Sequence, residues 1–122
     1  MGRLGIIPHK SCTELGRKVD AYLVKWRCER ENSSKNHLAY DGYRRNTYII
    51  PSQTPRFGSG EAKGIINKSV RGDDLYILVD VCNYSLTYSL CGHENHMSPD
   101  DHFQDLKRLI AAVGGKARRI TV

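Results

Sequence analysis

The alternation of hydrophobic and polar positions predicts short strands and two amphipathic helices. Residues Leu4–Ile7 form an apolar run that ends at Pro8, as expected for a first strand. Ser11 and Glu14 have the spacing of a capping box, which predicts a helix from about Cys12 to about Glu31. One face of this helix is apolar and is expected to pack into the core; its residues are Leu15, Val19, Tyr22, Leu23 and Trp26.

The middle of the chain mixes turn-rich segments with short apolar runs. Asn32–Asn46 is polar and is expected to form a loop or a partly ordered insertion. Thr47–Ile50 and Ala62–Asn67 have the composition of strands, and Ser52–Pro55 reads as a connector between them. Leu75–Val81 is the most hydrophobic run. Because it is continuous rather than alternating, it predicts a strand that is covered on both faces.

A second helix is marked at both ends. Ser98 is the expected N-cap, Pro99 occupies the first helical position, and Gly114 and Gly115 end the helix. We expect His102 on its exposed side, and a buried face made of Phe103, Leu106, Ile110 and Val113. A last strand is expected at Arg118–Val122.

This order of elements predicts an α/β fold with a mostly parallel sheet and flanking helices. The last three elements form a β-α-β unit, which implies parallel strands and a right-handed crossover. The chain ends inside its last strand, so residues 1–122 are expected to be the first part of a single domain that is truncated at its C-terminal end.

Composition narrows the choice of partners and compartment. The net charge of +6, from 19 Lys and Arg against 13 Asp and Glu, favours anionic partners such as phosphates or nucleotides, although an ordinary basic surface has the same balance. No apolar run approaches the roughly 18 residues of a membrane span. Four cysteines without a CxxC pair, and no signal peptide, predict a reduced, cytoplasmic protein.

The stretch RFGSGEAKGIINKSVRGDD, residues 56–74, carries the clearest chemistry. Phe57 lies beside a Gly-Ser-Gly turn with Glu61 just after it, and Ser69 and Arg71 lie in a later Ser-Val-Arg-Gly turn. Glycines allow close approach of a ligand to the backbone, and a guanidinium suits phosphate. The order F-x-[DN]-x-E, S-V-R-G and then R-I-T at residues 119–121 resembles the N-terminal segment of the ribose-phosphate pyrophosphokinases (phosphoribosyl pyrophosphate synthetases).

The resemblance implies a partial phosphoribosyltransferase-like, Rossmann-like domain of a Mg²⁺-dependent homo-oligomeric enzyme that uses ATP and ribose 5-phosphate. It implies that Phe57, Ser59 and Glu61 contact the adenine of ATP bound by a neighbouring subunit, with Ser59 in place of the family's Asp or Asn. It implies a regulatory phosphate site at Ser69 and Arg71, and no catalytic or metal-binding residue within this segment, which alone is expected to be inactive.

Each of these assignments has a simpler structural alternative. Phe57 can be a core aromatic with Glu61 a surface acid. Arg71 can pair with Asp73 or Asp74 in a plain turn. For the whole chain, the alternatives are a non-catalytic regulatory or assembly subunit of the same fold and a small basic nucleic-acid-binding domain. The scattered positive charges, without interleaved aromatics, argue against nucleic acid.

One further segment holds potential metal ligands. Asn83–Met97 is longer than the family's usual connector and contains Cys91, His93 and His96, with Cys82 nearby. These are zinc ligand types, but C-x-H-x-x-H is not a well-known zinc spacing, and a loop that contains histidines is common. The sequence has no P-loop, and the order of elements brings no Ser, His and Asp together.

Overall fold

The computed structural model describes residues 2–33 and 45–122, apart from the side chains of residues 31–33. In chain order the elements are β1 (Leu4–Pro8), the 3₁₀ turn η1 (Lys10–Cys12), α1 (Thr13–Ser33), β2 (Ser52–Gln53), β3 (Ile65–Ile66), β4 (Asp74–Leu78), β5 (Thr87–Leu90), β6 (His93–His96), α2 (Pro99–Val113) and β7 (Arg119–Thr121). The predicted α/β class is confirmed. Most of the predicted Asn32–Asn46 loop, residues 34–44, lies outside the described residues.

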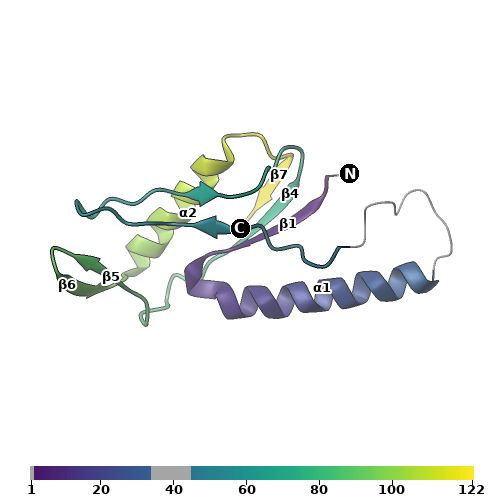
Figure 1. The fold of residues 1–122 in the computed structure, drawn as a ribbon, viewed down its shortest axis with the longest axis horizontal. Helices are drawn as coiled ribbons and strands as arrows, with labels where there is room; N and C mark the ends of the chain where they lie inside the picture. The colour runs from purple at the N-terminus through teal and green to yellow at the C-terminus, as the bar shows by residue number, and fades with distance from the viewer. Residues whose placement is uncertain (1, 34–44) are drawn as a thin grey trace.

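The centre of the fold is a parallel sheet with the strand order β1-β4-β7. Leu4 aligns with Asp74, and Asp74 aligns with Arg119. The β4-α2-β7 unit is therefore the predicted parallel crossover. In Figure 1, α1 lies below these strands, and α2 lies to the left of β4 and β7. The predicted strand Thr47–Ile50 forms only a parallel bridge from Ile49 to Ile6, which extends the sheet beside β1.

The core lies between the sheet and α2. The parallel register places Gly5 and Ile7 of β1 beside Leu75 and Ile77 of β4, so these residues share one face. The residues of the core cluster are Ile7, Ile50, Val70, Leu75, Ile77, Leu106, Leu109 and Val113. Burial of side chains of this size contributes about 1.5–3 kcal/mol each, which makes this layer the main source of stability.

The signals at both ends of α2 are confirmed. Ser98 and Asp101 form a reciprocal capping box, with the Asp101 N–H donating to Ser98 Oγ at 3.2 Å and the Ser98 N–H donating to Asp101 Oδ2 at 2.9 Å. Gly114 adopts a left-handed conformation with φ 60° and donates its N–H to Ala111 O. Glycine enters this conformation at little cost, so the helix ends where the sequence indicates.

The predicted buried face of α2 is partly wrong. Phe103 is 52 % exposed and Ile110 is also exposed, whereas His102 is fully buried instead of exposed. The buried residues are His102, Asp105, Leu106, Leu109 and Val113. The error has a physical cause: His102 and Asp105 find hydrogen-bond partners inside the protein, so the helix can turn two polar residues inward.

The long helix is confirmed, but its predicted cap is wrong and its predicted core face is partly wrong, since only Val19 and Leu23 of that face are half-buried. The turn η1 precedes α1, and the Ser11 N–H donates to His9 Nδ1 instead of beginning a capping box. Leu15, Tyr22 and Trp26 are all more than half exposed. The helix approaches the sheet closely near its start, where a Cβ on Gly16 would lie 2.5 Å from Pro8 Cβ. Further along, the Asp20 carboxylate accepts from the Tyr48 N–H at 2.6 Å, and only the later part of the helix extends past the sheet (Figure 1).

The cover on the buried strand is also less complete than predicted. β4 ends at Leu78, and its burial alternates, with Tyr76 exposed between Leu75 and Ile77. The expected two-sided burial is therefore wrong, because α2 covers the face of Leu75 whereas α1 leaves Tyr76 uncovered.

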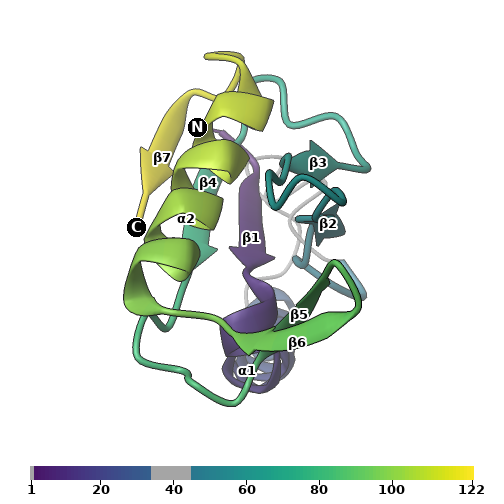
Figure 2. The same cartoon turned by 90° about the vertical axis from the view of Figure 1, so that its left-hand side faces the viewer.

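Two antiparallel pairs complete the fold. The predicted strand Ala62–Asn67 contains β3, whose partner β2 lies in the segment expected to be a connector. The predicted connector Asn83–Met97 instead contains the β5–β6 hairpin, in which Thr87 pairs with His96 and Leu90 with His93. Its turn uses Cys91 and Gly92 with positive φ angles, as two-residue hairpin turns require. Figure 2 shows both pairs on one side of β1.

Candidate functional site

The Phe57 turn is a hairpin tip that its own backbone holds closed. Arg56 and Ala62 form an antiparallel bridge beyond the β2–β3 pair. Between them, the Phe57 N–H donates to Glu61 O at 2.6 Å and the Gly60 N–H donates to Phe57 O at 2.9 Å. Gly60 has a φ of 88°, which a side chain would strain. We call residues Phe57–Glu61 the tip loop.

The tip loop presents the three predicted base-contacting residues to solvent. Phe57 is 47 % exposed, and Ser59 and Glu61 are exposed. The alternative that Phe57 is a core aromatic does not fit this exposure, since the core cluster lies between the sheet and α2. An exposed ring, a hydroxyl and a carboxylate on one closed turn are suited to stacking on a planar base and hydrogen-bonding its edge.

Arg56, a residue not selected from the sequence, reaches under the tip loop. Its Nη1 donates to Gly60 O at 2.8 Å, and its Nη2 lies 3.6 Å from Asp101 Oδ1 at the start of α2. The guanidinium carbon lies 3.9 Å from the centre of the Tyr88 ring on β5. Only proximity in the fold brings these groups together, and no spacing in the sequence indicates it.

The second predicted pair, Ser69 and Arg71, lies at the opposite edge of the sheet. Both are exposed in the turn that leads into β4, so they lie at the amino ends of the parallel strands. No ion pair joins Arg71 to Asp73 or Asp74 within the described residues, which does not favour the plain-turn alternative. The tip loop and this turn are therefore two separate sites.

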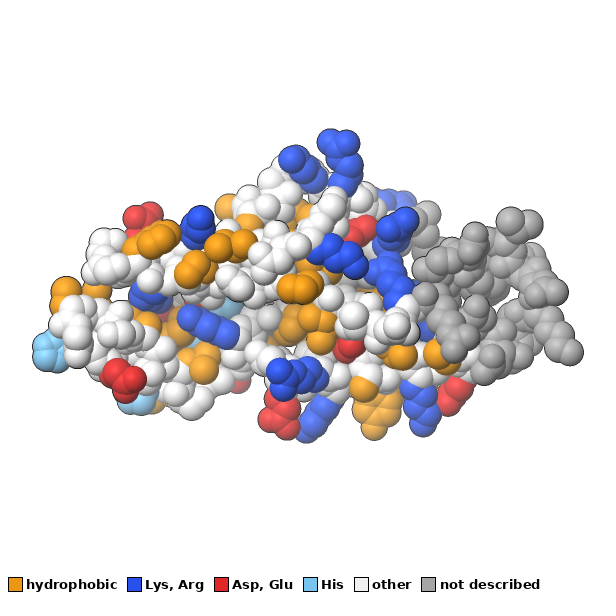
Figure 3. All heavy atoms as spheres, viewed as in Figure 1, with side chains coloured by type: hydrophobic (Ala, Val, Ile, Leu, Met, Phe, Trp, Pro, Cys, Tyr) orange, Lys and Arg blue, Asp and Glu red, His pale blue; other side chains and the backbone are white. Residues whose placement is uncertain are grey.

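A shallow cationic hollow of about 630 Å³ adjoins the Ser69–Gly72 turn. Its lining residues are Gly2, Arg3, Arg45, Lys68, Ser69, Arg71, Gly72 and Asp73. One nitrogen of Arg45, Nη1, already donates a hydrogen bond to Leu4 O at 3.1 Å. In Figure 3, lysine and arginine side chains gather on the side of the molecule where the strands of the sheet begin. Four cations against one carboxylate favour an anionic ligand.

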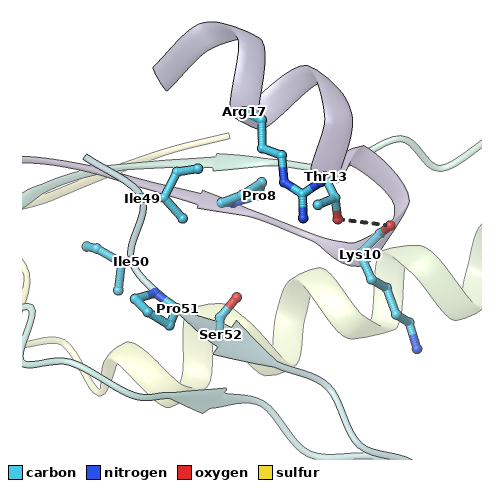
Figure 4. A pocket seen from close by; sticks show the side chains of 8 residues that line it. All are labelled: Pro8, Lys10, Thr13, Arg17, Ile49, Ile50, Pro51 and Ser52. Atoms are coloured by element: carbon cyan, nitrogen blue, oxygen red, sulfur yellow. Dashed lines mark hydrogen bonds between the residues drawn. The ribbon is translucent and has the colours of Figure 1, made fainter. Parts of the chain in front are cut away.

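A smaller hollow of about 250 Å³ lies between the start of α1 and the segment before β2. Its lining residues are Pro8, Lys10, Thr13, Arg17, Ile49, Ile50, Pro51 and Ser52. Figure 4 shows Arg17 descending from α1 into this space while Lys10 extends away from it. No residue selected from the sequence as a site residue lines it.

A buried polar network fixes the carboxyl ends of β1 and β4 to α2. Ser11 Oγ accepts from the Asp80 N–H at 3.0 Å and donates to His9 Nδ1 at 2.8 Å, and His9 Nε2–H donates to Asp105 Oδ2 at 3.0 Å. The expectation that no Ser, His and Asp meet is thus wrong. The Ser11 hydroxyl is buried and already holds a backbone N–H, so this network is structural.

The charge of Asp105 is stabilised within this network. Burial raises the pKa of its carboxyl group, but hydrogen bonds from His9 and Arg108 and the nearby charge of Lys10 outweigh burial, so its pKa lies below the ordinary value. Arg108 Nη1 donates to Asp105 Oδ1 at 2.8 Å. His102 lies edge-on to His9 and donates its Nε2–H to Asn83 O at 2.6 Å.

The histidines of the β5–β6 hairpin do not gather with Cys91. In the part of the chain that the structure describes, no group of three or more His, Cys, Asp or Glu side chains could hold a metal ion. His96 instead stacks on Tyr84, with ring centres 4.4 Å apart, and its Nδ1 lies 2.8 Å from Tyr84 O. The hairpin is thus ordered by strand pairing and ring contacts.

Comparison with known proteins identifies the family. Neither α1 nor α2 has the length and apolar character of a membrane span. Searches of curated proteins and of solved structures return no match. The family model described as the N-terminal domain of ribose phosphate pyrophosphokinase matches residues 4–122, which include the tip loop and the Ser69–Gly72 turn. The chain therefore belongs to the ribose-phosphate pyrophosphokinases, transferases of nucleotide biosynthesis, and represents their N-terminal domain.

Proposed function

We propose that this domain supplies the base-contacting loop of an enzyme that makes phosphoribosyl pyrophosphate. In this reaction the 1-hydroxyl oxygen of ribose 5-phosphate bonds to the β-phosphorus of ATP, the bond between the α- and β-phosphates breaks, the hydroxyl proton is released and AMP leaves. Family membership supports the reaction. The observation that carries the role of this chain is the half-exposed Phe57 on a closed, outward-facing loop.

Each tip-loop residue has a distinct part in this proposal. The Phe57 ring stacks on adenine, an interaction worth roughly 1–3 kcal/mol per base. Glu61 accepts a hydrogen bond from the exocyclic amine, and Ser59 supplies a hydroxyl where the family pattern has Asp or Asn. As the family resemblance implies, the base that this exposed loop meets is one bound by a neighbouring subunit of a homo-oligomer.

The metal-dependent chemistry is assigned outside this segment. Magnesium accompanies ATP in the proposed reaction, where it neutralises phosphate charge. The described residues gather no set of ligands that fits this ion, so we assign none of them to it and derive no step through it. The proposal thus treats residues 1–122 as the N-terminal part of a phosphoribosyltransferase-like domain that positions the nucleotide but lacks the catalytic charges.

Phe57→Ala in the full-length enzyme tests the stacking role. The Michaelis constant for ATP is expected to rise about tenfold or more, since one stacking contact is lost. The melting temperature should stay close to that of the wild type, because Phe57 is half-exposed. Phe103→Ala, which removes a similarly exposed phenylalanine from α2, is the matched control. An unchanged Michaelis constant for ATP in Phe57→Ala would contradict the proposal.

We further propose that the cationic hollow at Ser69 and Arg71 binds a regulatory phosphate. The hydroxyl, the guanidinium and the neighbouring Arg3 and Lys68 offer donors and charge without a competing ion pair to Arg71. Arg71→Gln is expected to weaken the response of activity to inorganic phosphate by about tenfold, the equivalent of one charge-assisted hydrogen bond. Arg17→Gln, in the separate hollow beside α1, should leave the response unchanged. An unaltered response in Arg71→Gln would exclude this site.

A further inference from the structure

The β5–β6 hairpin and the tip loop lie at the same end of the molecule although about 30 residues separate them in sequence. Figure 1 shows the hairpin below the outermost turn of the chain between β2 and β3. Tyr88 contacts Arg56, and the Leu90 methyl carbons lie 3.7 Å from where a Cβ on Gly60 would be. The hairpin thus supports the tip loop from beneath at two points.

Arg56 contacts both the hairpin and the tip loop and so links the two. Its side chain is largely buried, and two of its nitrogens, Nε and Nη2, have no hydrogen-bond partner. A buried guanidinium is costly unless its environment compensates for lost water. Three contacts compensate here: the Gly60 carbonyl, the Asp101 carboxylate at 3.6 Å and the face of the Tyr88 ring.

These contacts link the tip loop to the hairpin and to the start of α2. Gly60 O is the only carbonyl of the turn that accepts from Arg56 among the interactions of the described residues, and Gly60 immediately precedes Glu61. A guanidinium is planar and rigid, so fixing its face on Tyr88 and one edge near Asp101 also fixes the direction of its Nη1–H. The orientation of the carbonyl that receives this N–H then follows.

We propose that Arg56, held in place by Tyr88 of the β5–β6 hairpin, is the positioning residue that aligns the tip loop for the adenine of ATP. This inference rests on the proposed function of Phe57, Ser59 and Glu61. It adds that the hairpin between β4 and α2 takes part in nucleotide recognition without touching the nucleotide. We call the contacts of Arg56 with the Tyr88 ring and with Gly60 O the brace, and its loss affects the binding of ATP but not that of ribose 5-phosphate.

The test compares Tyr88→Leu with Tyr88→Phe in the full-length enzyme. Leucine keeps apolar volume but has no ring face, whereas phenylalanine keeps the face and removes only a hydroxyl for which the described residues show no hydrogen bond. Without the ring face Arg56 loses its cation–π contact, so amide exchange within residues 57–61, at the hydrogen-bonded Phe57 and Gly60 N–H groups, should accelerate about tenfold in Tyr88→Leu. Amide exchange in β4 of Tyr88→Leu should match that of the wild type. Exchange at residues 57–61 of Tyr88→Phe should also match the wild type.

Kinetics then decide whether the brace serves nucleotide binding. In Tyr88→Leu the Michaelis constant for ATP is expected to rise about threefold to tenfold, with that for ribose 5-phosphate unchanged. Arg56→Lys should give the same split, because an ammonium cannot both stack flat and direct a fixed N–H at Gly60 O. If exchange at residues 57–61 is unchanged in Tyr88→Leu, the brace does not exist and the inference is overturned.

A second outcome separates this inference from the function on which it rests. Suppose that exchange accelerates in Tyr88→Leu and that Phe57→Ala, but not Tyr88→Leu, raises the Michaelis constant for ATP. The tip loop then binds the base but the brace does not position it, and this result overturns the inference alone. If Phe57→Ala leaves that constant unchanged, the proposed function itself fails, whatever the result for Tyr88.

Discussion

The two helices look alike in sequence and behave differently in the fold. Both carry apolar residues at helical spacing, yet α2 buries Leu106, Leu109 and Val113 whereas α1 leaves Leu15 and Trp26 more than half exposed. α2 crosses between two neighbouring strands and lies along the sheet, whereas α1 is held on one side through Gly16, Asp20 and Arg27, and its end extends beyond the sheet (Figure 1). Periodicity therefore identifies a helix and its apolar stripe, but burial depends on what the rest of the chain places opposite that stripe.

The two helices also differ in which kinds of side chain they bury. The buried face of α2 includes Asp105 and His102, both completely enclosed, while three of the five residues of the apolar stripe of α1 are exposed. Hydrogen bonds from His9 and Arg108 replace the water that Asp105 loses, so its burial is tolerated. We expect substitutions along α2 to cost far more stability than equivalent ones along α1.

Asp105→Asn is expected to have the largest effect. Removing one partner of a buried ion pair costs about 3–5 kcal/mol, because Arg108 loses its neutralising charge. Urea unfolding at pH 7 measures the loss. A change below about 1 kcal/mol, the range of an exposed ion pair, would show that this network contributes little.

The contribution of Asp105 should also depend on pH in a defined direction. Its pKa is lower in the folded protein than in the unfolded chain, so its contribution is complete above the unfolded value of about 3.9 and is lost as pH falls through the folded value. The difference in unfolding free energy between the wild type and Asp105→Asn should therefore shrink below about pH 4. A difference that grows on acidification would contradict this assignment.

Leu109→Ala and Leu15→Ala form a matched pair on the two helices. Leu109 is fully buried, so its truncation should cost about 3 kcal/mol through lost burial and the cavity that remains. Leu15 is 53 % exposed, and its truncation should cost less than about 1 kcal/mol. Thermal and urea unfolding of both variants provide the comparison, and equal losses would remove the distinction between the helices.

Ser98→Ala tests the start of α2 against the start of α1. Loss of the capping hydroxyl is expected to cost about 1 kcal/mol. Thr13→Ala should cost less, since the Thr13 hydroxyl donates only to Lys10 O at 3.4 Å on an exposed turn. If Thr13→Ala proves the more damaging of the two, the start of α1 is more tightly constrained than its hydrogen bonds indicate.

Trp26→Gln should have the smallest effect. The indole is 56 % exposed and contacts Tyr22 on the same helix, so the unfolding free energy should change by no more than about 0.5 kcal/mol. A loss well above about 1 kcal/mol would mean that the apolar stripe of α1 is covered in solution, and sedimentation of the variant beside the wild type would then show whether a second copy covers it.

The sequence alone determined the features that depend on neighbouring residues. Ser98, Pro99 and Gly114 set the ends of α2 because capping and left-handed turns involve groups within a few residues of each other. The strand at Leu75, the β-α-β unit and the exposed turn at Phe57 follow from the same short-range patterns. The family was also evident from motifs, because they lie in sequence order.

Only the tertiary structure decided which side chains are buried and which groups meet. His9, Ser11 and Asp105 come together because β1, β4 and α2 converge at the carboxyl end of the sheet, and Arg56 meets Tyr88 because a hairpin folds back beneath the tip loop. Such contacts join residues far apart in the chain and lower the cost of burying polar groups. Local propensity carries no information about them, which is why the exposure of the α1 stripe, the burial of His102 and the contacts of Arg56 were not predicted.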